Sequence, residues 1–83
     1  MNTKNILIEY LKNKHGQIVG CVAATGKGMV GWSKCNSKDS FDKSMALTIA
    51  FGRAAKNSKT EIPFTVRPYF DKMVERAGRY FKN

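Results

Sequence analysis

The sequence predicts an α+β fold in which a three-stranded antiparallel β-meander is followed by two α-helices packed on one face. Two observations support this prediction. The first half of the chain alternates short runs of β-branched and aromatic residues with turns that contain glycine and asparagine. The second half places apolar residues at helical spacing, with Pro63 and Pro68 between the two helical segments. The 83 residues show no repeat and no interdomain linker, so we expect a single domain, 1–83.

The strands are expected at about residues 5–12, 17–24 and 29–35, joined by turns at 13–16 and 25–28. Side chains alternate between the two faces of a strand, so the register set by the turns decides which residues share a face. If both turns close symmetrically, one face holds Ile6, Ile8, Tyr10, Val19, Cys21, Ala23, Val30 and Trp32. The other face then holds Leu7, Glu9, Leu11, Ile18, Gly20, Val22, Gly31, Ser33 and Cys35. The first face has the larger apolar groups and is the expected core face, although a one-residue slip at either turn would rearrange both sets.

The second face is smoother and partly polar, because it carries Gly20, Gly31 and Ser33. A second subunit could pack against its glycines, so a homodimer is among the expected partners. On the first face, Cys21 is expected to be a small buried hydrophobe opposite Trp32. The opposite placement of Cys21 and Cys35 disfavours a disulfide between them.

The first helix is expected at about residues 39–56, with Asp39 or Ser40 as its N-cap. Its apolar residues form two stripes, and two stripes predict burial over a wide arc of the helix. One stripe consists of Phe41, Met45, Thr48, Ile49 and Gly52, and the other of Leu47, Phe51, Ala54 and Ala55.

The last helix is expected at about residues 68–82, with Pro68 in its first turn, where a missing N–H group has no cost. The connector before it is expected to be extended around residues 62–64. The apolar face of this helix consists of Phe70, Met73, Val74, Ala77, Tyr80 and Phe81. The opposite face is charged and consists of Lys72, Glu75, Arg76, Arg79 and Lys82.

The formal net charge is +9, and the charge is unevenly spread along the chain. Acids begin the expected helices and bases end them, which is the arrangement that the helix macrodipole favours. That explanation does not reach the stretch between Tyr10 and Lys38, which contains lysines and His15 but no carboxylate. We therefore expect the binding contacts to come from Lys12, Lys14, Lys27, Lys34 and Lys38, with Arg53 as a further candidate.

The sequence offers no arrangement typical of a catalytic, metal or nucleotide site. The string from Gly26 to Gly31 fits G-x-G-x-x-G, but a strand is expected to follow it where a dinucleotide site needs a helix. His15 and the two cysteines are too few for a structural zinc site. His15 also has no nearby carboxylate that would orient it as a general base. We therefore expect no metal, no cofactor and no enzymatic activity.

Membrane insertion and secretion are also not expected. No apolar run approaches the roughly 18 residues that cross a bilayer. The apolar run near the N-terminus ends at Glu9 and is too short for a signal peptide. These features favour a cytoplasmic protein.

The stretch from Val30 to Lys43, which contains Gly-Trp-Ser-Lys-Cys-Asn-Ser-Lys-Asp-Ser-Phe, is followed by Ile-Ala-Phe-Gly-Arg-Ala at residues 49–54. It resembles a set of small phage-encoded proteins that share a Gly-Trp-Ser-x-Cys-Asn-x-x-Asp-x-Phe core followed by Ile-Ala-x-Gly-Arg-Ala. The resemblance implies no activity and no functional residue. It implies a phage accessory protein that would act in the cytoplasm of the host cell.

Non-catalytic binding is the function that the sequence predicts, and nucleic acid or a complex that contains it is the expected partner. A positive surface attracts polyanions, and lysine contacts to phosphates would dominate the affinity. The alternative is an inhibitor of a host defence protein, of the anti-CRISPR kind, which would occupy a protein surface. In that case the basic residues would cover an acidic patch on the host protein.

Overall fold

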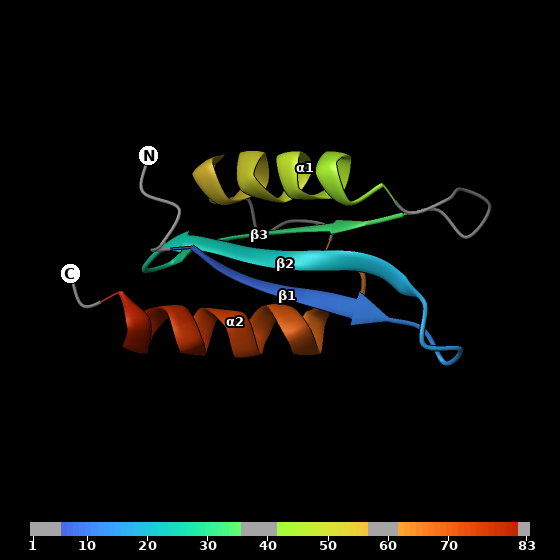
Figure 1. The fold of residues 1–83 in the computed structure, drawn as a ribbon. Coiled ribbons are helices and arrows are strands. Elements are labelled where there is room, and N and C mark those ends of the chain that lie inside the picture. Colours follow the sequence, from blue (N-terminus) through green and yellow to red (C-terminus); the bar gives the residue numbers. More distant parts are fainter. Residues whose placement is uncertain (1–5, 36–41, 57–61, 82–83) are drawn as a thin grey trace.

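The computed structural model describes residues 6–35, 42–56 and 62–81. The elements follow in the order β1 (Leu7–Lys12), β2 (Ile18–Gly26), β3 (Met29–Lys34), α1 (Lys43–Lys56) and α2 (Arg67–Tyr80). The three strands form one antiparallel sheet in the order β1-β2-β3 (Figure 1). The predicted α+β class, with a meander followed by two helices, is confirmed.

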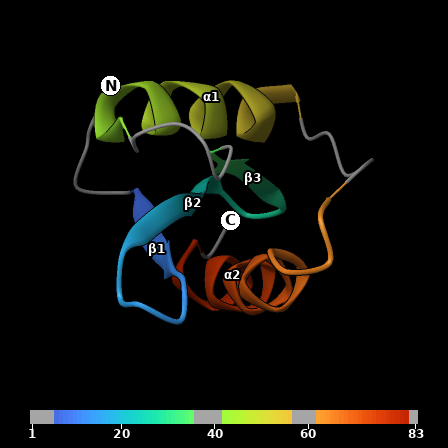
Figure 2. The same cartoon turned by 90° about the vertical axis from the view of Figure 1, so that its right-hand side faces the viewer.

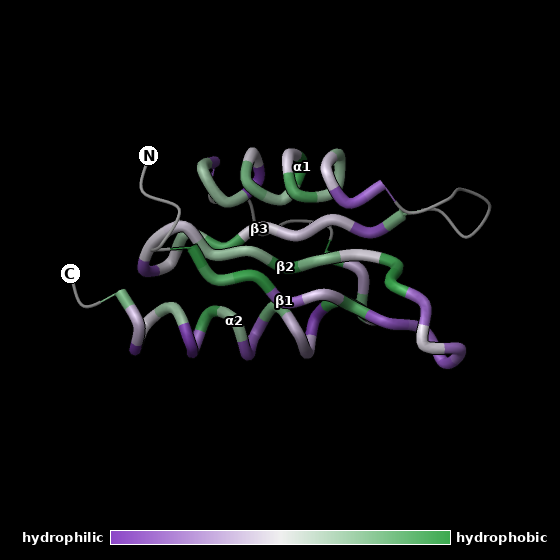
Figure 3. The backbone as a smooth tube through the Cα atoms, in the orientation of Figure 1, coloured by the Kyte–Doolittle hydropathy of each residue, from purple (hydrophilic) through white to green (hydrophobic). Residues whose placement is uncertain are grey.

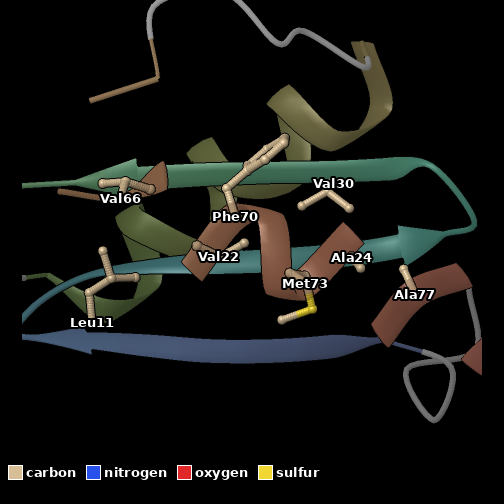
Figure 4. Close-up of a cluster of buried hydrophobic side chains, with 8 residues drawn as sticks. All are labelled: Leu11, Val22, Ala24, Val30, Val66, Phe70, Met73 and Ala77. Carbon is tan, nitrogen blue, oxygen red and sulfur yellow. The ribbon is translucent and has the colours of Figure 1, made fainter. Parts of the chain in front are cut away.

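The two helices cover opposite faces of the sheet, so the prediction that both pack on one face is wrong (Figures 1 and 2). On one face, α2 packs against strand residues that include Val22 (Figure 4). On the other face, α1 packs against Cys21 and Ala23. The reason lies in β2, which is buried from Gly20 to Ala24 without alternation. A strand that is apolar on both faces needs cover on both faces.

The two core clusters differ in the size of their side chains. The α2 cluster consists of Leu11, Val22, Ala24, Val30, Val66, Phe70, Met73 and Ala77 (Figure 4). The α1 cluster consists of Cys21, Ala23, Ala46 and Ala50.

The β2–β3 turn does not close symmetrically, and this changes the predicted faces. The register shifts between Ala24 and Gly26, which is the signature of a β-bulge. Trp32 consequently pairs with Val22 on the α2 face, and Cys21 pairs with Ser33. The predicted grouping of Val30 and Trp32 with Cys21 is therefore wrong. The grouping of Ile8 and Tyr10 with Cys21 and Ala23 is confirmed by their pairing. The register also shifts between Leu11 and Lys12, and Val19 packs against the α2 cluster, so its predicted place on the face of Cys21 is wrong.

Helix α1 lies so close to β3 that only a glycine fits beneath it. A Cβ atom on Gly31 would overlap with the carbonyl oxygen of Ala50 and the amide nitrogen of Ala54. The buried residues of α1 are accordingly all alanines, namely Ala46, Ala50 and Ala54. The helix thus occupies the strip around Gly31 that was predicted to receive a second subunit. Gly20 lies on the other face, where it pairs with Lys34.

The N-cap of α1 is Asp42, and the helix begins later than the predicted start near residue 39. The Asp42 carboxylate accepts a hydrogen bond from the Met45 N–H at 3.0 Å, and the Asp42 carbonyl oxygen accepts one from the Ala46 N–H at 2.9 Å. The predicted caps, Asp39 and Ser40, lie outside the described residues.

The first predicted stripe of α1 is wrong, because Met45, Thr48, Ile49 and Gly52 are all exposed. Its remaining member, Phe41, lies outside the described residues. The close approach to Gly31 explains this result, since it selects the small residues of the helix for the buried side. The second stripe is partly confirmed. Ala54 is buried, and Leu47 and Phe51 pack against the α1 cluster.

The predicted apolar face of α2 is confirmed for Phe70, Met73 and Ala77, which are buried, but not for Tyr80, which is 48% exposed. Pro68 lies in its first turn, as predicted. The segment before it is a turn, so the predicted extended conformation is wrong: the N–H groups of Val66 and Arg67 both donate to the Pro63 carbonyl oxygen, at 2.9 and 3.0 Å.

Candidate functional site

The structure separates the predicted binding lysines between the two ends of the sheet. Lys12 pairs with Ile18 and Lys34 with Gly20, so both lie beside the start of β2. Lys27 follows Gly26, at the end of this nine-residue strand. At about 3.3 Å per residue, β2 is about 30 Å long, so Lys27 belongs to a different surface. Lys38 lies outside the described residues.

We call the surface around the start of β2 the basic end, and we define it by Lys12, Lys14, Lys34 and Arg67. Lys12 and Lys34 lie on the two strands that flank β2, about 12 Å apart by backbone, from two strand spacings of roughly 4.8 Å and an offset of two residues along β2. The Lys34 ammonium donates to Thr65 Oγ1 at 2.8 Å, which joins β3 to the segment that leads to Arg67 and α2.

Lys14 lies in the β1–β2 turn, which is the hydrophilic projection at the right of Figure 3. Asn13 holds this turn. Its side-chain oxygen accepts hydrogen bonds from the N–H groups of His15 and Gln17, at 2.9 and 3.0 Å. Gly16 supplies the positive φ of 79° that the turn requires. The turn is thus fixed by a short polar side chain, and Lys14 and His15 stay exposed.

Both helices begin at the basic end and run toward the β2–β3 turn (Figure 1). A helix carries a partial positive charge at its N-terminus, so the α2 dipole adds to the charge of the lysines there, whereas the Asp42 carboxylate at the start of α1 offsets the dipole of that helix. Helix α2 has no such offset, because its N-cap, Val66, makes no side-chain cap and its first turn has no acid. The macrodipole explanation of the helical charges therefore does not apply to Arg67.

The described carboxylates all have partners within the protein. Glu9 pairs with Arg76 at 3.1 Å, Glu75 with Arg79 at 2.7 Å, and Asp42 caps α1. Asp71 pairs with Arg67 at 3.3 Å, where the two side chains are 62% and 61% exposed. An ion pair so exposed is strongly screened and weakens the charge of Arg67 only slightly.

Arg53, the sixth predicted contact, is engaged within the protein. Its guanidinium donates to the Trp32 carbonyl oxygen at 2.9 Å and stacks over the indole, with 4.0 Å between Cζ and the ring centroid. A cation held over an aromatic ring and hydrogen-bonded to a carbonyl fixes α1 to β3. We therefore do not include Arg53 in the basic end.

Phe64 is a surface residue that the sequence reasoning missed. Its side chain is 86% exposed, more than any other large hydrophobic residue that the structure describes. It precedes Thr65, the residue that Lys34 contacts, so it lies beside the basic end. Its place between Pro63 and Thr65, outside every apolar stripe, was the signal in the sequence.

The described residues give little support for a metal site or a cysteine nucleophile. No three His, Cys, Asp or Glu residues within 6–35, 42–56 and 62–81 come together as metal ligands would. Burial raises the pKa of the Cys21 thiol, whose Sγ donates to the Ala46 carbonyl oxygen at 3.6 Å. That thiol is protonated at neutral pH and is a poor nucleophile.

A hollow of about 150 Å³ lies between α2 and β1, lined by Glu9, Tyr69, Lys72, Met73 and Arg76. Two of its charged residues, Glu9 and Arg76, already form an ion pair with each other. Neither helix is both long enough and apolar enough to cross a membrane, as far as the described residues show.

The basic end is thus a surface that gathers cations and helix N-termini, with an aromatic side chain beside it. No protein-family model matches this chain, and no curated protein or solved structure matches it either.

Proposed function

We propose that the protein binds nucleic acid through the basic end, without catalysing a reaction. The observation that carries the proposal is the convergence of Lys12, Lys14, Lys34 and Arg67 with the N-terminus of α2, which no acid caps. A polyanion is the partner that gains most from such a surface, because each phosphate contact releases counterions. This activity suits the phage-type accessory protein that the sequence resembles, acting in the cytoplasm of the host.

A comparison of the two ends supports the choice of surface. The far end, which we define by Lys27, Lys56 and Arg79, also carries cations. Lys56 and Arg79 lie in the last turns of their helices, where the partial negative charge of the helix C-terminus offsets them. At the basic end, the α2 dipole has the same sign as the side chains, and no acid in the first turn of α2 offsets it. Equal numbers of lysines therefore produce a more positive potential at the basic end.

Salt-dependent binding tests the proposal with a matched pair of variants. Lys12→Ala/Lys14→Ala removes two charges from the basic end, and Lys27→Ala/Lys56→Ala removes two from the far end. All four side chains are exposed. The wild type should bind a labelled oligonucleotide with an affinity that falls steeply with salt.

The basic-end variant should reduce the steepness of log Kd against log salt by about 1.4 on a single strand, and the far-end variant should leave it unchanged. Equal effects of the two variants would contradict the choice of surface. An absence of wild-type binding to single-stranded and duplex oligonucleotides at low salt would sink the proposed function.

A second candidate is the inhibitor of a host defence protein, and the outer side of α1 favours it. Met45 is 61% exposed and Ile49 is 38% exposed, so this helix presents an apolar strip that a protein surface could cover. A pull-down from host lysate with nuclease would test it. A partner that survives nuclease and is lost in Met45→Lys/Ile49→Lys, but kept in Met29→Lys, would support inhibition.

A further inference from the structure

We infer that the basic end takes single-stranded nucleic acid, with an unpaired base stacked on Phe64 and a neighbouring phosphate at Lys34. The inference rests on the proposed function and adds to it the class of nucleic acid and a residue outside the predicted set. Three observations carry it: the exposure of Phe64, the rigidity of the turn that bears it, and the position of Lys34.

Phe64 is exposed while residues on both sides of it are packed. Val66 is fully buried, and Ile62 packs against the α2 cluster. The segment is therefore attached to the core on each side of the phenyl ring. A Phe side chain that is 86% exposed gains almost none of the free energy that burial would provide. Packing of the protein itself thus does not account for an aromatic residue at this position.

The turn holds the backbone of Phe64 in place. Two N–H groups, of Val66 and Arg67, donate to the carbonyl oxygen of Pro63, and the ring of Pro63 restricts its own φ. An aromatic group on a backbone fixed in this way loses little entropy when a flat partner stacks on it. Phe64 therefore presents an exposed ring on a fixed backbone, which we call the platform for a planar group.

A cation lies next to this platform. Lys34 Nζ donates to the Thr65 hydroxyl at 2.8 Å, so the ammonium is held one residue away from Phe64. A nucleotide offers a planar base and a phosphate close together, and proteins that bind single strands combine aromatic stacking with cationic contacts in this way. In a duplex the base faces are already stacked on each other. The pair of Phe64 and Lys34 therefore fits an unpaired nucleotide and not a duplex.

A second copy of this chain is a poorer occupant of the same surface. Two molecules of charge +9 repel each other, and an approach at Phe64 would bring Lys34 and Arg67 of both copies together.

Anisotropy titrations with a labelled oligothymidine and with a hairpin duplex of equal nucleotide number test the inference. Phe64→Ala should weaken single-strand binding about tenfold, because stacking on one aromatic side chain contributes about that factor. Phe64→Trp should restore binding, and Phe64→Leu, which is apolar but lacks a π face, should not. The salt dependence should stay unchanged in Phe64→Ala, since no charge is removed.

The outcomes separate the inference from the proposed function. Equal affinity for the single strand and the duplex, or equal losses on both in Phe64→Ala, would overturn the inference while the basic end remains the binding surface. If Phe64→Leu binds the single strand as tightly as the wild type, the contact is apolar and not a stacking interaction, and the inference is overturned. Absence of binding to either oligonucleotide would overturn both. Thermal unfolding should show that Phe64→Ala folds as the wild type does, because the ring is exposed.

Discussion

The two faces of the sheet are covered in two different ways. Helix α2 packs through large side chains such as Phe70 and Met73, which fill the space between the helix and β2 (Figure 4). Helix α1 packs through alanines and approaches β3 until its backbone lies over Gly31. The packing of α2 therefore depends on large buried apolar side chains, and the packing of α1 depends on small residues, above all on the missing side chain of Gly31. The same sheet should respond to mutation in opposite ways on its two faces.

The largest expected effect is on the α1 side, from the addition of atoms. Gly31→Val would place a branched side chain where even a Cβ overlaps with the backbone of Ala50 and Ala54. Overpacking costs about 1–3 kcal/mol or more, and the overlap with backbone predicts the upper end, at about 3 kcal/mol or more. Chemical denaturation measures the loss. A cost below about 1 kcal/mol would show that α1 can move away from the strand freely.

The α2 side should instead suffer most from the removal of atoms. Met73 is 1% exposed, so Met73→Ala should cost about 2–5 kcal/mol in the free energy of unfolding. Met73→Leu keeps most of the volume and should cost less than about 1.5 kcal/mol. Urea titrations of the two variants provide the comparison, and equal losses would contradict a role for volume.

The start of α1 gives a smaller effect. Asp42→Ala removes the hydrogen bond to the Met45 N–H and should cost about 1 kcal/mol. Asp42→Asn keeps an acceptor in place and should retain most of the stability. Helix α2 has no side-chain cap at Val66, so no equivalent substitution exists there. If Asp42→Ala is neutral in thermal unfolding, the cap is dispensable.

A substitution on the outer side of α1 should stabilise the protein, in contrast to Gly31. Gly52 is exposed, and nothing lies within 4 Å of the Cβ that an alanine would add. Gly52→Ala should therefore increase the free energy of unfolding by about 0.5–1 kcal/mol through helix propensity. A decrease, measured in the same denaturation series, would show that this side of α1 has a neighbour in solution.

The pH dependence of stability is the smallest effect near neutral pH, and it comes from the α1 cluster. Burial raises the pKa of Cys21 above its ordinary value of 9.0. The folded protein thus binds the thiol proton more tightly than the unfolded chain does. The associated stability is fully present below the unfolded pKa and is lost as pH rises through the folded pKa. Cys21→Ala should flatten the decline above about pH 9, and an unchanged slope would exclude this source.

The fold class was readable from the sequence because it depends on local patterns. The turns at Asn13 and Gly28 and the apolar face of α2 each depend on residues that lie close together in the sequence. The assignment of faces failed because a single extra residue at Thr25 moves Val30 and Trp32 to the other side of the sheet. The predicted burial of Met45 and Ile49 was wrong for a different reason. Hydrophobicity favoured its burial, but the steric limit at Gly31 comes from a distant part of the chain.

The candidate site was only partly readable. The absence of acids from residues 11–38 predicted a basic surface from the lysines there, and their role in binding stays a prediction. Their division between two ends follows from the antiparallel order of the strands, which separates Lys27 from Lys12 and Lys34. The direction of the helices and the exposure of Phe64 depend on tertiary packing. No periodicity in the sequence reports either of them.

The contact between Arg53 and Trp32 has a consequence for aggregation. The Cys35 N–H donates to the Val19 carbonyl oxygen, so by alternation the carbonyl of Trp32 points away from β2, along the outer edge of β3. The Arg53 guanidinium occupies that carbonyl and denies it to an incoming strand from another molecule. The outer edge of β1 is guarded differently, by the exposed charges of Glu9 and Lys12. Salt screens charges and leaves packed contacts intact, so intermolecular strand pairing at high ionic strength should start from β1.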